Sequence, residues 1–188
     1  MRVIAGEFKG RRLKAPRGWD VRPTSDKVKG ALFNIIGSRI DGARVIDLFA
    51  GTGNVGIEAL SRGAGHVMFV ENDPEVRALL AANLATCGIS STKSTLWKGR
   101  GVASLISHLK RQPSSYGLVF ADPPYHRPET FRLLRPFLQG LALEPGGWLV
   151  IEHASHMASP TPTLPMRQLR QYPYGDTMLS VYTKAEAA

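Results

Sequence analysis

The chain has 188 residues, close to the size of a single domain, and its 43% hydrophobic and 21% charged residues argue against wholesale disorder and against a fibrous repeat. Lysine and arginine number 24 against 15 aspartates and glutamates, and the net charge of +9 favours a polyanionic partner such as nucleic acid or an anionic membrane face. A single cysteine, Cys87, excludes an intramolecular disulfide, and no stretch approaches the roughly 18 apolar residues of a spanning helix, so we expect a cytoplasmic protein.

Most of the positive charge lies in the first 40 residues, which hold ten basic and three acidic side chains, whereas the other 148 residues have a surplus of only two positive charges. Stretches 3–5 and 12–14 flank a glycine-marked turn, which predicts a hairpin. Thr24 is expected to cap a helix whose apolar positions run from Val28 to Ile36. Clustered lysine and arginine release counterions when they neutralise phosphates, so we interpret residues 1–40 as a nucleic-acid-binding arm packed on a main domain, 41–188. The alternative is a solvated surface hairpin. The candidate binding residues are Arg11, Arg12, Lys14 and Arg22.

Beyond the arm, apolar strands alternate with amphipathic helices. Strands are expected at 44–49, 66–71, 95–97, 117–121 and 148–152, and helices at 55–62, 74–86, 102–110 and 129–138. Strands separated by helices pair in parallel through right-handed crossovers, so the pattern predicts a doubly wound α/β sheet. At the end of the chain, stretches 168–172 and 178–183 flank a Pro-Tyr-Gly-Asp turn and predict an antiparallel strand pair.

A glycine-rich loop follows the first strand of the main domain, where Gly51-Thr52-Gly53-Asn54-Val55-Gly56 leads into a helix. Glycines at this spacing let the backbone turn tightly and approach a ligand at the helix N-terminus. Glu71 ends the next strand, 20 residues after Gly51, where a carboxylate can accept hydrogen bonds from both ribose hydroxyls. The pair predicts an adenosine-containing cofactor, either a nicotinamide dinucleotide or S-adenosylmethionine, and Asp47 suits the ammonium of the latter. A purely structural turn is the alternative. The candidate cofactor-binding residues are Asp47, Gly51, Gly53, Asn54, Gly56 and Glu71.

The segment Asp122-Pro123-Pro124-Tyr125 follows the fourth strand, at the edge where ligands of open α/β sheets bind. Asp122 offers a carboxylate acceptor, Pro123 a carbonyl acceptor and Tyr125 an aromatic face, which together match a planar heteroaromatic amine. The amino group of a nucleobase is a poor nucleophile because its lone pair is delocalised, and acceptors out of the ring plane draw it toward tetrahedral geometry. We therefore predict methyl transfer to a flipped base, with Asp122, Pro123 and Tyr125 as catalytic residues. A proline-rich turn with a structural aspartate is the alternative.

A metal site is not expected. His153 and His156 follow Glu152, but no cysteine and no second carboxylate stands nearby in the sequence. A surface or strand-end role is the preferred interpretation for both histidines.

Several segments resemble the bacterial 16S ribosomal RNA guanine-N2 methyltransferases, and the resemblance covers nearly the whole chain. They are Arg2-Val3-Ile4-Ala5-Gly6, Arg22-Pro23-Thr24-Ser25-Asp26, Phe33-Asn34, Asp47-Leu48-Phe49-Ala50-Gly51, Gly56-Ile57-Glu58-Ala59-Leu60-Ser61-Arg62-Gly63-Ala64 and Asp122-Pro123-Pro124-Tyr125. The last motif is shared with adenine amino methyltransferases, whereas the Arg-Pro-Thr and Glu-Ala-Leu-Ser-Arg-Gly-Ala runs are more specific to this family.

The resemblance implies a Rossmann-like class I S-adenosylmethionine-dependent methyltransferase sheet with an N-terminal hairpin and helix extension and a C-terminal antiparallel strand pair. It implies methylation of the 2-amino group of one guanine, position 966 in the usual 16S numbering. The implied partner is 16S rRNA within the 30S subunit or its assembly intermediate, and we expect a monomeric protein.

Three positions depart from the family pattern. Lys29-Gly30 stands where Arg-Glu is frequent, so a cofactor contact from that glutamate is absent. Asn54-Val55 replaces the usual Ala-Leu, and Arg100 stands where related enzymes carry an acidic or amide residue near the adenine. The adenine contact therefore stays open.

Three other functions are compatible with parts of the pattern. DNA adenine methylation uses the same chemistry, although no target-recognition domain is evident in this length. A nicotinamide oxidoreductase uses the same fold, although Asp122-Pro123-Pro124-Tyr125 has no part in hydride transfer. A noncatalytic RNA-binding protein is the third. Under the leading hypothesis the arm grips RNA phosphates while the sheet performs the chemistry, so removing Arg11, Arg12 and Lys14 should spare S-adenosylmethionine affinity.

Overall fold

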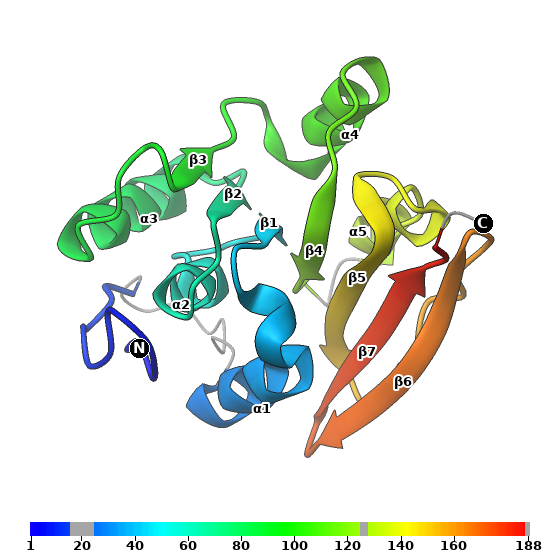
Figure 1. The fold of residues 1–188 in the computed structure, drawn as a ribbon, viewed down its shortest axis with the longest axis horizontal. Coiled ribbons are helices and arrows are strands. Elements are labelled where there is room, and N and C mark those ends of the chain that lie inside the picture. Colours follow the sequence, from blue (N-terminus) through cyan, green and yellow to red (C-terminus); the bar gives the residue numbers. More distant parts are fainter. Residues whose placement is uncertain (16–24, 125–127, 187–188) are drawn as a thin grey trace.

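The computed structural model describes residues 1–15, 25–124 and 128–186, with the backbone alone for residues 128 and 129. Within these ranges the strands form one seven-stranded sheet of order β3-β2-β1-β4-β5-β7-β6 (Figure 1). The strands are β1 (Arg44–Leu48), β2 (His66–Val70), β3 (Ser94–Leu96), β4 (Tyr116–Ala121), β5 (Leu143–Ala154), β6 (Met166–Tyr174) and β7 (Thr177–Lys184). The first five are parallel, and β7 is antiparallel to both β5 and β6. The predicted doubly wound sheet and its antiparallel tail are confirmed.

Helices cover both faces of this sheet. They are α1 (Asp26–Ile36), α2 (Asn54–Ser61), α3 (Pro74–Thr86), α4 (Gly101–Arg111) and α5 (Pro128–Arg132), with short 3-10 turns at Gly37–Ile40 and Phe137–Gln139. The cap of α1 is Ser25, whose hydroxyl accepts the Val28 N–H at 3.2 Å, and not Thr24, which lies outside the described residues. In the described part of the chain, no helix combines the length and the apolar character needed to cross a bilayer.

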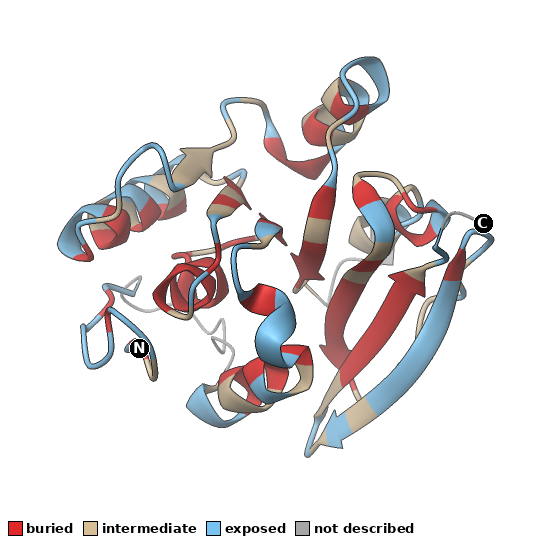
Figure 2. Cartoon of the chain, in the orientation of Figure 1, coloured by how far each residue is buried: buried red, intermediate tan, exposed pale blue. Residues whose placement is uncertain are grey.

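The core is divided by the sheet into two buried clusters. Alternate strand residues face α1, α2 and α3 on one side, represented by Val45, Phe69 and Phe120. Their neighbours face α4 and the segment after β4 on the other side, represented by Ile46 and Val119. Helix α2 is buried along its whole length, whereas β6 is an exposed edge strand (Figure 2). Because α2 is buried on all sides, it contacts the sheet on one side and the N-terminal segment on another.

One predicted helix is wrong in its extent. The helix expected at 129–138 ends at Arg132, because Pro136 has no N–H to donate and its ring would clash with the carbonyl four residues earlier. The predicted N-terminal hairpin is present as a short antiparallel pairing around the Arg2–Arg12 bridge, with the N–H groups of Val3 and Leu13 bonded to the carbonyls of Arg11 and Met1 at 3.0 and 3.1 Å. Backbone groups at its turn and at its end bond to α2 and α3.

Candidate active site

The glycine loop makes a tight turn between β1 and α2. Gly51 and Gly53 have φ angles of 53° and 85°, in the left-handed region that glycine adopts without strain. Gly56 is required for close packing, because a Cβ there would lie 2.2 Å from Cε1 of Phe69 on β2. The loop therefore brings the N-terminus of α2 to the carboxyl edge of the sheet.

Asp47, on β1, stabilises this turn through a hydrogen bond to its backbone. Its side chain is 2% exposed, and its Oδ2 accepts the N–H of Gly56 at 2.9 Å. Burial raises the pKa of Asp47 to about 7, the Gly56 N–H opposes this shift, and the charges of Asp122 and Glu71 add to it. A buried carboxylate with a raised pKa beside an open loop is a candidate for binding a positive group.

Glu71 ties the loop to the end of β2. Its Oε2 accepts the Gly51 N–H at 2.9 Å, and its Oε1 accepts the N–H groups of Asn72 and Asp73 at 2.7 and 2.9 Å. Each carboxylate oxygen has two lone pairs, so Oε2 keeps acceptor capacity beyond these bonds. Glu71 both shapes the loop and presents a partly exposed carboxylate at the position predicted for ribose.

The Asp122 motif begins where β4 ends, on the same edge. Pro123 is buried, Asp122 and Pro124 are partly exposed, and the hydroxyl of Thr130 donates to the Pro124 carbonyl at 3.4 Å. The strand β4 lies next to β1, with Ala121 paired to Leu48. Tyr125, the predicted stacking residue, lies outside the described residues.

The carboxylates of Asp47, Glu71 and Asp122 thus gather at one edge, close enough for the charges of the last two to raise the pKa of Asp47. Three negative groups around a glycine loop favour a cationic ligand. S-adenosylmethionine carries an ammonium and a sulfonium, and this donor set fits it. A nicotinamide dinucleotide, with its two phosphates, fits these carboxylates less well.

Asn54 takes part in a different set of contacts. Its Oδ1 accepts from Nζ of Lys29 at 2.7 Å, and the same ammonium donates to the Arg2 carbonyl at 2.7 Å and lies 3.2 Å from Oε2 of Glu58. Lys29 and Glu58 are fully buried. Burial lowers the pKa of Lys29, and the charge of Glu58 counteracts this shift. Asn54 was predicted as a cofactor-binding residue, and its side-chain oxygen instead accepts from Lys29 and so helps to anchor α1 and the N-terminus.

The N-terminal arm is bonded to α2 through two of the segments that carry the family resemblance, residues 2–6 and 56–64. Glu58 accepts the N–H groups of Ile4 and Ala5 at 2.8 and 3.0 Å, and Ser61 accepts from Glu7 and Phe8. Gly6 approaches so closely that a Cβ would lie 1.7 Å from the Ser61 carbonyl oxygen. Two motifs more than fifty residues apart are thus the two sides of one contact.

The predicted RNA-binding residues differ in how they are held. Arg12 and Lys14 are exposed, and Asn83 on α3 fixes the backbone of Lys14 through the Lys14 N–H at 2.8 Å and its carbonyl at 3.1 Å. Arg11 donates to the Thr86 carbonyl at 2.7 Å and its guanidinium lies 5.5 Å from the Phe8 ring centroid, so it also holds the arm on α3. Arg22 lies outside the described residues.

Three residues near the edge were not singled out for the site from sequence. Arg77 on α3 donates to the carbonyls of Glu71 and Trp97 at 3.1 and 2.6 Å and so joins the ends of β2 and β3. Glu152, 5% exposed, follows Ile151, the partner of Ala121, and so stands beside Asp122 in the sheet. His153, one residue on, is buried, and its Nε2 is 2.8 Å from the Ser180 hydroxyl. A lone arginine in a helix or glutamate in a strand carries no local signal of such a position.

Comparisons with known proteins find similarity over almost the entire chain. The family model described as Conserved hypothetical protein 95 matches residues 1–183. The chain is 39% identical over 184 residues to "Putative rRNA methyltransferase YlbH" of Bacillus subtilis, covering 98% of this chain and 99% of that protein. It is 34% identical over 172 residues to "Ribosomal RNA small subunit methyltransferase D" of Escherichia coli K12, covering 88% and 79%. A solved structure, "Putative methyltransferase yhhF from Escherichia coli", matches with a TM-score of 0.83 at 28% identity, covering 100% and 99% of the two chains.

Proposed function

The chain belongs to the Conserved hypothetical protein 95 family, and from that premise we propose that it is a ribosomal RNA methyltransferase acting on the 2-amino group of a guanine in the small-subunit RNA. The relatives named as rRNA and small-subunit methyltransferases support the substrate class. The methyl donor is S-adenosylmethionine and the partner is 16S rRNA, on its own or within the 30S particle.

The observation that carries this proposal is the grouping of Asp47, Glu71 and Asp122 around the glycine loop. When bound, S-adenosylmethionine would supply a methyl group attached to a positively charged sulfur. After the transfer this sulfur is part of a neutral thioether, which is the leaving group. Asp47 offers its carboxylate to the ammonium, and Glu71 offers the second acceptor capacity of Oε2 to the ribose. Gly51 keeps the backbone free of a side chain at an open part of the loop, where the cofactor would approach, whereas Gly53 is needed for packing because a Cβ there would lie 2.4 Å from Cδ1 of Leu80.

The target amine is held by the Asp122 motif. Asp122 and the Pro123 carbonyl accept hydrogen bonds from its two N–H groups, which draws the lone pair out of conjugation and toward the methyl group. The methylated nitrogen then releases one proton, and the neutral thioether leaves. The buried position of Pro123 and the Thr130 bond to Pro124 fix these acceptors before the base arrives. Tyr125 is proposed as the face on which the flipped base stacks.

The proposal is tested by incubating radiolabelled S-adenosylmethionine with 30S subunits from cells that lack the modification, followed by mass mapping of the labelled nucleotide. We expect one N2-methylguanine in 16S rRNA, and a loss of at least 100-fold in rate with Asp122→Ala, as for other lost positioning and electrostatic contacts. Duplex DNA added as competitor should take up no label.

Glu144→Ala is the matched control, because Glu144 is an exposed carboxylate near the start of β5, away from the carboxyl edge. It should retain the rate of the wild-type chain. Label in adenine or in DNA would refute the guanine specificity, and undiminished transfer by Asp122→Ala would refute the role of that residue.

A further inference from the structure

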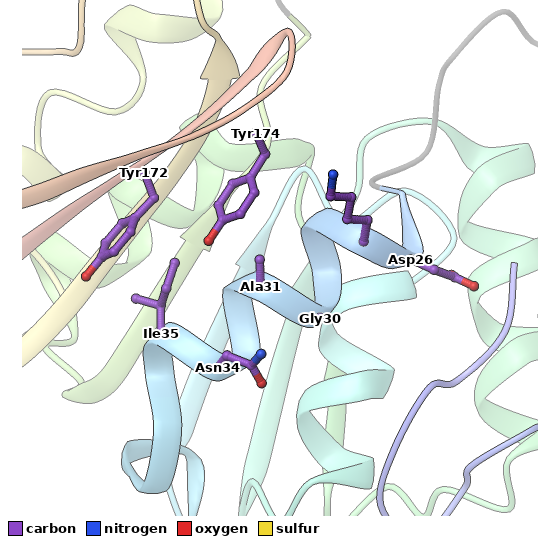
Figure 3. A pocket seen from close by; sticks show the side chains of 8 residues that line it. Asp26, Gly30, Ala31, Asn34, Ile35, Tyr172 and Tyr174 are labelled. Atoms are coloured by element: carbon purple, nitrogen blue, oxygen red, sulfur yellow. The ribbon is translucent and has the colours of Figure 1, made fainter.

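An open hollow of about 710 Å³ lies between α1 and the tip of the β6–β7 hairpin. Tyr172 and Tyr174 project from β6 toward α1, with Ile35 and Asn34 on the helix opposite them (Figure 3). Both rings are only partly buried, and Asn34 is exposed. The hollow therefore presents two aromatic surfaces and one amide to solvent.

The register of the sheet relates this hollow to the active site. Ile151 pairs with Ala121, so the next residue, Glu152, stands beside Asp122. Glu152 pairs with Leu179, which pairs with Tyr172. Tyr172 thus lies in the row of Asp122 three strands away, roughly 14 Å at the usual strand spacing.

Both positions also face the same layer. Leu179 and Phe120 belong to the buried cluster under α1, and residues two apart on a strand share a face, which places Asp122 and Tyr172 on the α1 side. Tyr174 lies two residues further along β6 on that face. The separation of Asp122 and Tyr172 is short enough for one RNA strand bound at the carboxyl edge to contact both positions a few nucleotides apart.

The chemistry around the hollow matches a nucleotide. Lys27 lines it, and the Arg170 guanidinium lies 5.2 Å from the Tyr172 ring centroid, so cations stand beside the aromatic rings. The carboxylate of Asp26, also at the hollow, is 3.2 Å from Nε of Arg2, which offsets its charge. Aromatic faces bordered by cations and an amide bind unpaired bases by stacking, with phosphates neutralised at the rim.

We propose that this hollow binds an unpaired nucleotide of the RNA substrate, close in sequence to the target guanine. The inference rests on the proposed rRNA methyltransferase function and adds a second contact with the RNA, separate from the N-terminal arm. It assigns base stacking to Tyr172 and Tyr174 and phosphate contact to Lys27 and Arg170.

The experiment compares wild-type chain with Tyr172→Leu/Tyr174→Leu, which keeps apolar bulk but removes the rings. Equilibrium binding to a fluorescein-labelled single-stranded RNA that spans the target guanine is measured, together with KM and kcat on 30S subunits and affinity for S-adenosylmethionine. We expect the Kd and KM to rise tenfold or more, since stacking of one base is worth that much, while kcat and S-adenosylmethionine affinity change less than twofold.

Two variants separate stacking from damage to the hairpin. Tyr172→Phe/Tyr174→Phe retains the rings and should bind RNA like wild type. Leu169→Ala removes an exposed apolar side chain from the same strand and should also leave the Kd unchanged. As a measurement that needs no variant, RNA with 4-thiouridine placed a few nucleotides from the target guanine should crosslink to the peptide 171–177 of the wild-type chain.

An unchanged Kd in the leucine variant, or crosslinks confined to other peptides, would overturn the proposal. A variant that loses affinity for 30S particles but not for the free RNA would also overturn it, because the hollow would then contact a ribosomal protein. Absence of methyl transfer by the wild-type chain, with RNA binding still dependent on the rings, would refute the proposed function and leave the nucleotide site standing.

Discussion

The interface between the arm and α2 and the site beside the glycine loop each bury a carboxylate. Glu58 lies between Lys29 and Arg62, whose cationic nitrogens are 3.2 and 2.8 Å from its oxygens, and it accepts two backbone N–H groups of the arm. Asp47 accepts one N–H, from Gly56, and the charges that act on it are the negative ones of Asp122 and Glu71.

The difference teaches how to distinguish a structural carboxylate from a binding one. Glu58 is compensated inside the protein, so its charge holds two segments together. Asp47 stands among like charges, and under the proposed function the ammonium of the bound ligand would stabilise its ionised form. Burial alone would not separate the two, because both side chains are nearly inaccessible to water.

Removal of Glu58 should have the largest effect. Glu58→Ala leaves Lys29 buried without its carboxylate and leaves the N–H groups of Ile4 and Ala5 without their acceptor, so we expect a loss of about 3–5 kcal/mol in the free energy of unfolding. Urea denaturation followed by circular dichroism measures it. Glu75→Ala, an exposed residue on α3, should change stability by less than about 0.5 kcal/mol. Equal effects of the two substitutions would contradict the anchoring role.

Asp47→Asn should stabilise the protein, in a way that depends on pH. The folded-state pKa of about 7 exceeds the ordinary value of 3.8, so between these values the unfolded chain releases the proton that the buried carboxyl group keeps, and the free energy of unfolding falls by about 1.4 kcal/mol per pH unit. Asparagine can still accept the Gly56 N–H. The advantage of the variant should grow from pH 5 to pH 7 and level off, reaching up to about 4 kcal/mol. Urea midpoints across this range measure it, and a difference independent of pH would disprove the assignment.

Affinity for S-adenosylmethionine should depend on the same proton. Because the ammonium requires the ionised form of Asp47, we expect affinity to rise nearly tenfold per pH unit up to about 7, and to fall again where the α-amino group of the ligand deprotonates, near pH 8. Isothermal titration calorimetry from pH 5.5 to 8.5 measures the profile. In Asp47→Asn the rising limb should disappear, and parallel profiles for the two proteins would show that Asp47 does not face the ligand.

The smallest effect on the fold is expected at the exposed end of the arm. Arg12→Met/Lys14→Met should weaken RNA binding and reduce the slope of log affinity against log salt by about 2, while S-adenosylmethionine affinity stays the same. Filter binding at several salt concentrations measures the slope. Adding Arg11→Met should also lower the unfolding midpoint, since Arg11 bonds the Thr86 carbonyl. A loss of S-adenosylmethionine affinity in the double variant would show that arm and cofactor site are not independent.

The N-terminal arm and the cofactor site are less independent of each other than the charge distribution suggested. The positive surplus before residue 41 predicted an RNA-binding arm separate from the catalytic sheet. In the structure, Lys29 joins the Arg2 carbonyl directly to Asn54, the first residue of α2 after the glycine loop. The exposed side chains of Arg12 and Lys14 take no part in this connection, whereas the backbone of Lys14 is joined to the loop through Asn83, whose Nδ2 donates to the Thr52 carbonyl at 2.9 Å.

The sequence was sufficient for most of the features whose signal is local. Alternation of strands and helices, the Gly51 to Gly56 turn and the Asp-Pro-Pro motif each lie within about a dozen residues, and all stand at the carboxyl edge as expected. The cap at Ser25 and the break before Pro136 were missed, although both have local causes. Neighbouring cap candidates compete by one hydrogen bond, and the apolar pattern continues past the proline.

Long-range contacts were decided only by the tertiary structure. No pattern in the Arg2 to Gly6 segment predicts its contact with Glu58, and no pattern in α1 predicts that Tyr172 and Tyr174 lie opposite it. Backbone pattern fixes which face of an element is buried, because side-chain direction repeats along a helix or strand. Which buried groups meet, and whether a carboxylate finds cations or other carboxylates, depends on how the whole chain packs, and that grouping separates the anchor at Glu58 from the site at Asp47.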